Sequence, residues 1–141
     1  MKEITVLLLD DHTDVRVLLA KRLGSLPGFK VVAHSANPLV GADLAHVMRP
    51  EVIIADFQRR QFQRELYRWL ARAAPQSHLV ILTSYMEECE QGECKEAGVA
   101  LCLLKGISVR ELAEKLRELV TGRAPDVQSP AAAGRGETRG A

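Results

Sequence analysis

Short apolar runs recur along the chain and are separated by segments of mixed character. Each run is nearly continuous in apolar residues, which is typical of a strand that is covered on both faces of a sheet. The pattern predicts five such strands, over residues 4–9, 29–34, 51–57, 78–84 and 99–104.

The segments after these runs place apolar residues at helical spacing. They predict five helices, over residues 14–26, 37–48, 64–74, 84–97 and 109–120. Several ends carry capping signals: Asn37 precedes a proline at the first helical position, and Ser108 begins a capping box. Gly24 and Gly122 are placed to end the first and last helices.

Regular alternation of buried strands and helices predicts an α/β fold, a doubly wound five-stranded parallel sheet with helices on both faces. Ligand sites in such sheets lie beyond the carboxyl ends of the strands. We assign residues 1–122 to this domain. Residues 123–141 are rich in Pro, Gly and Ala and lack large apolar side chains, so we expect a disordered C-terminal tail or a truncated linker there.

Composition narrows the class of protein. The length of 141 residues suits one domain, and a net charge of +1 gives no support to a nucleic-acid-binding surface. No apolar run is long enough to span a bilayer, and the start of the chain resembles a first strand more than a signal peptide, so we expect a cytoplasmic protein. The three cysteines, Cys89, Cys94 and Cys102, have no framework spacing, which favours ordinary packing residues over a disulfide scaffold or metal site.

Polar residues with a shared chemistry stand at the ends of the predicted strands. They are Asp10, Asp11, Asp56, Thr83 and Lys105. Three carboxylates on one rim repel one another unless a cation joins them, and hard oxygen ligands suit Mg²⁺. A metal with a lysine stabilises the charge that develops in phosphoryl transfer, and an aspartate can be the nucleophile.

Four motifs carry a resemblance to a known family: "LLLDDH", "VIIADF", "VILTS" and "CLLKG". With these residues in this order, the chain resembles a response-regulator receiver domain of two-component signalling over about residues 4–121. It is most similar to receivers that precede helix-turn-helix output domains. The resemblance implies a flavodoxin-like (βα)5 fold and a phospho-accepting signalling switch that is no enzyme, beyond catalysing its own phosphorylation and dephosphorylation.

The resemblance also implies a role for each site residue. Asp56 would be the phosphorylation site, and Asp11 and Asp56 would bind Mg²⁺ together with the backbone carbonyl of Gln58. Asp10 would act on the metal mainly through bound water.

The remaining implied roles concern the phosphoryl group and the partners. Thr83 would contact the phosphoryl group, and Lys105 would pair with Asp56 and then with the phosphate. The donor would be a sensor histidine kinase or a phosphotransfer protein, and output would come through protein–protein contact, with a homodimer left open. Direct nucleic-acid or membrane binding by this chain is not expected.

Four features depart from the family pattern or leave alternatives open. The 57–65 loop lacks the usual Pro and Gly and carries Arg59 and Arg60, which fit either a solvated loop or an arginine that reaches the pocket. Cys102 replaces an aromatic residue and reads as a small buried hydrophobe, and Gly106 replaces a proline and suggests a more flexible turn. His12 fits a transition-metal ligand or, as we favour, a partly exposed loop residue. The loop and Cys102 support an alternative function, a phosphorylation-independent pseudo-receiver that acts as an interaction module.

Overall fold

The computed structural model describes residues 2–56, 63–84 and 96–122. The strands are β1 (Ile4–Asp10), β2 (Phe29–Ser35), β3 (Val52–Asp56), β4 (His78–Thr83) and β5 (Val99–Leu104). The helices are α1 (Thr13–Gly24), α2 (Pro38–Met48), α3 (Gln63–Ala73) and α6 (Val109–Thr121).

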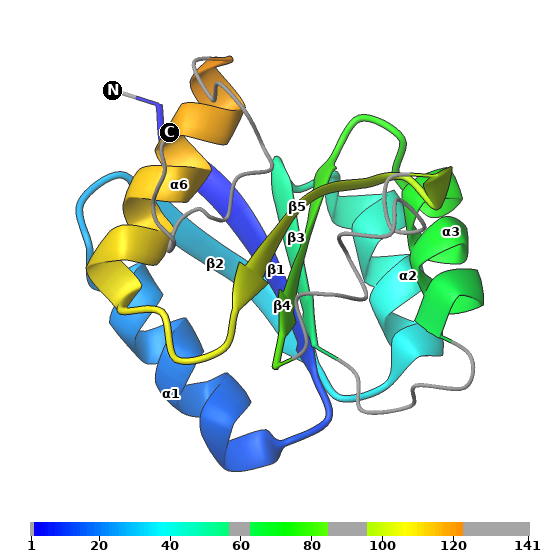
Figure 1. The fold of residues 1–141 in the computed structure, drawn as a ribbon, viewed down its shortest axis with the longest axis horizontal. Coiled ribbons are helices and arrows are strands. Elements are labelled where there is room, and N and C mark those ends of the chain that lie inside the picture. Colours follow the sequence, from blue (N-terminus) through cyan, green and yellow to red (C-terminus); the bar gives the residue numbers. More distant parts are fainter. Residues whose placement is uncertain (1, 57–62, 85–95, 123–141) are drawn as a thin grey trace.

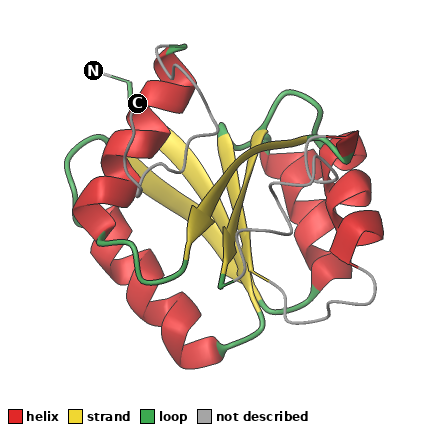
Figure 2. Cartoon of the chain, in the orientation of Figure 1, coloured by secondary structure: helices red, strands yellow, loops and turns green. Residues whose placement is uncertain are grey.

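The five strands form one parallel sheet in the order β2-β1-β3-β4-β5 (Figure 1). Helices α1 and α6 cover one face of the sheet, and α2 and α3 cover the other, as Figure 2 shows for the same view. The predicted doubly wound parallel sheet is therefore confirmed. The strand order reverses beside β1, so the carboxyl ends of β1 and β3 flank the position where such folds bind ligands.

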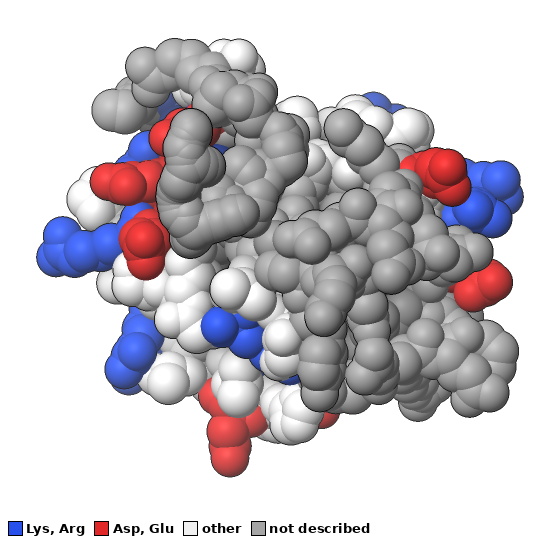
Figure 3. Space-filling model, viewed as in Figure 1, with Lys and Arg blue, Asp and Glu red and all other residues white. Residues whose placement is uncertain are grey.

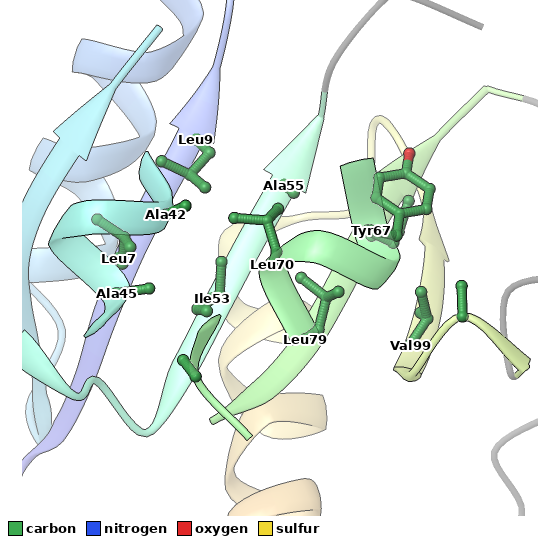
Figure 4. Close-up of a cluster of buried hydrophobic side chains, with 13 residues drawn as sticks. Leu7, Leu9, Ala42, Ala45, Ile53, Ala55, Tyr67, Leu70, Leu79 and Val99 are labelled. Carbon is green, nitrogen blue, oxygen red and sulfur yellow. The ribbon is translucent and has the colours of Figure 1, made fainter. Parts of the chain in front are cut away.

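The core forms two layers because neighbouring residues of a strand point to opposite faces of the sheet. Leu7, Leu9 and Ile53 pack toward α2 and α3, where Figure 4 shows them with the helix residues Ala42, Ala45 and Leu70. The intervening Leu8 packs on the other side with Leu23 of α1 and Leu116 of α6. Each fully buried leucine stabilises the fold by about 1.5–3 kcal/mol.

Gly41 explains how closely α2 approaches the sheet. A Cβ atom at this position would lie 2.7 Å from the Leu9 side chain, which is 1% exposed. Only a glycine therefore lets the helix approach β1 to this distance without moving Leu9, which stands one residue before Asp10.

The capping signals in the sequence are confirmed. The Asn37 side chain accepts hydrogen bonds from the backbone N–H groups of Leu39 and Val40, and Ser108 accepts one from Glu111. Gly122 adopts the left-handed conformation that ends α6.

The segment predicted as the first helix extends two residues too far, to Leu26, whereas the predicted stop at Gly24 is confirmed as the end of α1. Pro27 disfavours helical geometry in Leu26, the residue before it. The other helix and strand boundaries differ from those predicted by one residue or none, wherever the structure describes them.

Two predictions concern residues that lie wholly or largely outside the described ranges. Of the helix predicted over residues 84–97, residues 85–95 lie outside the described residues, as does the predicted tail over residues 123–141. Within the described residues, none of the helices has the length and apolar character needed to cross a membrane.

Candidate functional site: an acidic rim at the strand ends

Two buried aspartates lie side by side at the end of the central strands. Asp10 of β1 and Asp56 of β3 are register partners in the parallel sheet. They are 6% and 7% exposed, and among the described residues they are the two charged side chains that are buried. Burial of a carboxylate is costly unless a cation or hydrogen-bond donors offset its charge, so this pair requires compensation.

Lys105 supplies part of that compensation. Its Nζ lies 2.9 Å from Oδ2 of Asp56, and its side chain is about one third exposed. The backbone N–H of Lys105 donates to the carbonyl oxygen of Thr83, with 2.9 Å between N and O. This bond joins the ends of β4 and β5, so the structure brings Thr83 and Lys105 together as the sequence predicted.

The environment of Asp56 favours its neutral form. Burial raises the pKa of the Asp56 carboxyl above its ordinary value, and the hydrogen bond from Lys105 opposes this rise. The negative charges of Asp10 and Asp11 raise the pKa further. Together these effects leave the pKa of the Asp56 carboxyl above its ordinary value.

Asp11 and His12 complete the exposed side of the rim. Ligand atoms of Asp10, Asp11 and His12 all lie within 4.8 Å of one another. Nδ1 of His12 is 3.6 Å from the carboxylate of Asp10 and 3.4 Å from that of Asp11. The imidazole is partly exposed, as expected, and it also contacts both acids, which the sequence did not predict.

The donor set fits a hard divalent cation. Carboxylate oxygens are the ligands that Mg²⁺ prefers, and three carboxylates at one rim attract a cation. The structure brings together Asp10, Asp11 and Asp56 of the predicted ligands. Gln58, Arg59 and Arg60 lie outside the described residues.

No pattern in the sequence indicated Arg16, a residue of α1 that contacts this rim. Its guanidinium donates one hydrogen bond to the carbonyl oxygen of Asp10 and one to the ring of His34. The donor–acceptor distance is 2.9 Å in each bond. An arginine six positions after a strand-end aspartate is an ordinary helix residue in the sequence, and only the bend between β1 and α1 brings it back to Asp10.

The structure shows the backbone conformation of Gly106 and the bonding of Cys102, the two residues near Lys105 that depart from the family pattern. Gly106 has a φ of +90°, which a proline with its φ near −65° cannot adopt, so this glycine fixes a left-handed turn after the lysine. Cys102 was predicted to be a small buried hydrophobe; it is half-buried against the core and is disulfide-bonded. Spacing along the chain could not show this, because a disulfide depends on the distance between residues in space.

Residues 6–117 match the model of a protein family described as the response regulator receiver domain. The chain belongs to this family. Figure 3 shows acidic and basic side chains of this receiver domain interspersed around α6.

Known proteins support this assignment. The response regulator VraR of Staphylococcus aureus is 29% identical over 128 residues, which are 90% of this chain and 60% of VraR. This receiver thus spans about 60% of the length of the curated relatives it matches.

Solved structures share the fold. The receiver domain of NarL from Mycobacterium tuberculosis aligns with a TM-score of 0.76 at 18% identity, covering 87% of this chain and 100% of that domain. A LuxR-family response regulator from Aurantimonas aligns with a TM-score of 0.77 at 23% identity, covering 96% of this chain and 100% of the other. Receiver domains are signalling switches that bind Mg²⁺ in an acidic pocket and interact with histidine kinases or phosphotransfer proteins.

Proposed function

We propose that this receiver accepts a phosphoryl group on Asp56, with Mg²⁺, from a sensor histidine kinase or a phosphotransfer protein. One observation carries the proposal: the Lys105 ammonium lies 2.9 Å from a buried Asp56 that pairs with Asp10 across the sheet. Folding alone does not require two buried acids and a lysine at the same edge, because apolar residues at these positions would avoid the cost of burying charge.

The reaction transfers a phosphoryl group from one nucleophile, the imidazole of the donor, to another, the Asp56 carboxylate. An oxygen of the Asp56 carboxylate forms a bond to phosphorus, the phosphorus–nitrogen bond of a phosphohistidine breaks, and its electron pair returns to the imidazole of the donor. Lys105 then binds an oxygen of the transferred group, and the Thr83 hydroxyl donates a hydrogen bond to another. These contacts stabilise the charge of the phosphoryl oxygens in the transition state and in the product.

The metal would be held by the three carboxylates of the rim. Asp11, Asp56 and the backbone carbonyl of Gln58 would bind it, and Asp10 would act through bound water. When bound, Mg²⁺ supplies positive charge to the phosphoryl oxygens. Sheet register supports this assignment, because it sets Asp10 and Asp56 side by side at the rim.

The proposal extends to the cellular setting. We place the protein in the cytoplasm, and its output passes through protein–protein contact. A homodimer is consistent with this form of output.

Intact-mass spectrometry tests the proposal. We expect incubation with Mg²⁺ and acetyl phosphate to add the mass of one phosphoryl group to the wild-type protein and none to Asp56→Asn. Asp43→Asn is the matched control, because Asp43 is exposed on α2, and it should be phosphorylated like the wild type. A wild-type protein that gains no mass and binds no Mg²⁺ would contradict the proposal.

If the wild-type protein gains no mass and binds no Mg²⁺, the second candidate function is a phosphorylation-independent interaction module. The observation in its favour is Cys102, which is disulfide-bonded three positions before Lys105. A covalent bond at this position restrains β5, where a phosphorylation-driven rearrangement next to Lys105 would otherwise begin.

A further inference from the structure

Arg16 connects three parts of the molecule near the acidic rim. From α1, its Nη1 donates to the carbonyl oxygen of Asp10 at the end of β1, with 2.9 Å between the atoms. Its Nε donates to Nδ1 of His34 near the end of β2, also with 2.9 Å between the atoms. The planar guanidinium fixes both directions at once, which a lysine cannot do.

Asp10 is consequently held at two points. Its main-chain carbonyl accepts from Arg16, and its side-chain Oδ1 accepts from the backbone N–H of His12 over 2.8 Å. Asp10 is 6% exposed, so little water is available to replace a lost donor. The corner that carries Asp10 and Asp11 is therefore tied to the helix that follows it.

We propose that Arg16 is a positioning residue for the metal site: it fixes the Asp10–Asp11 corner in the geometry that Mg²⁺ requires, and His34 orients Arg16. This inference rests on the proposed function. Mg²⁺ tolerates little deviation from octahedral geometry, so a small displacement of the corner weakens binding. Residues that orient metal ligands typically change affinity by about 10–100-fold when they are mutated.

Charge and geometry predict opposite effects, which makes the proposal testable. The guanidinium is positive and repels a nearby cation, so its charge alone would make Arg16→Met bind Mg²⁺ more tightly. If positioning dominates, Arg16→Met binds Mg²⁺ about 10-fold more weakly. Arg16→Lys keeps the charge and one donor, and we expect it to recover part of the lost affinity.

Isothermal titration of the full chain with Mg²⁺ alone provides the measurement. Arg22→Met is the matched control, since Arg22 is an exposed arginine on the same helix, and its Mg²⁺ affinity should equal that of the wild type. His34→Asn retains an acceptor for Arg16 and should bind nearly normally, whereas His34→Leu should lose affinity. Tighter binding by Arg16→Met, or unchanged binding, would overturn the positioning role.

A second measurement needs no metal. In the metal-free protein, hydrogen exchange of the His12 amide followed by NMR should be at least several-fold faster in Arg16→Met than in the wild type or Arg22→Met, because His12 donates to the loosened Asp10. Unchanged exchange would overturn the inference even if the variant were less stable. A wild-type protein that binds no Mg²⁺ would refute the proposed function, and the exchange experiment would then decide whether Arg16 holds the corner.

Discussion

The ion pair between Asp56 and Lys105 spans the end of a strand to which neither residue belongs. Asp56 ends β3 and Lys105 follows β5, while β4 lies between these two strands in the sheet. The 2.9 Å contact therefore passes over the end of β4, which carries Thr83. A phosphoryl group on Asp56 would meet the lysine and the hydroxyl from adjacent strands.

Replacing Lys105 should change the titration of Asp56. The lysine lowers the pKa of this carboxyl against the effects of burial and of Asp10 and Asp11, so Lys105→Met should raise the Asp56 pKa further. A carboxyl-carbon NMR titration of the metal-free protein measures this pKa. Lys115→Met, which removes an exposed lysine from α6, should leave it unchanged. An Asp56 pKa that stays the same or falls in Lys105→Met would contradict the electrostatic account.

Asp56 should also make metal-free stability depend on pH. Its pKa is raised in the folded state, so the folded protein binds more protons than the unfolded chain between the two pKa values. The free energy of unfolding should therefore fall as the pH rises through this interval, by at most about 1.4 kcal/mol for each pKa unit of difference.

Asp56→Asn removes this contribution and serves as the comparison. Its unfolding free energy, measured by urea denaturation without Mg²⁺, should lack that decrease and should exceed the wild-type value at neutral pH. An equal pH dependence in both proteins would show that Asp56 is not the group responsible.

Gly106 should tolerate substitution poorly for a reason that lies in the backbone. At a φ of +90°, alanine is strained, and Gly106→Ala should cost about 1–2 kcal/mol of stability although nothing crowds its Cβ. Gly24→Ala is an informative control, because Gly24 ends α1 with ordinary van der Waals space around its Cβ, and alanine is the better helix former. Thermal denaturation should show opposite shifts, and a stable Gly106→Ala would contradict the assigned turn.

The disulfide of Cys102 predicts a thiol count. The chain has three cysteines, so the non-reduced, denatured protein should react with a thiol reagent at one position, and at all three after reduction. Cys102→Ser should expose two thiols without reduction. Three reactive thiols in the non-reduced wild type would mean that the bond does not form in the isolated protein, as is usual for cysteines in a reducing compartment.

The parts of the fold and site that follow from local patterns were predictable. Continuous apolar runs identified strands covered on both faces, and the strand-end rule then brought Asp10, Asp56 and Lys105 to the same edge of the sheet. These predictions succeeded because parallel strands connected by helices all place their carboxyl ends on one side.

The remaining features depend on contacts that no local pattern records. Arg16 reaches Asp10 only because the chain bends between β1 and α1, and the partner of a disulfide is a matter of spatial distance. The sequence identified Gly106 as unusual but not its left-handed backbone, since the same residue type also occurs where no such angle is needed.

The pairing of Asp10 with Asp56 makes the chemistry of this receiver depend on the alignment of two strands. Successive side chains of a strand point to opposite faces, so a slip of one residue between β1 and β3 would break this pairing and move every β3 side chain to the opposite face of the sheet. A single-residue insertion in β3 would thus remove the acceptor and disrupt both core layers together. We therefore expect single-residue insertions to be tolerated in the connecting segments and not in β3, because the strand alignment that builds the core also sets Asp56 beside Asp10.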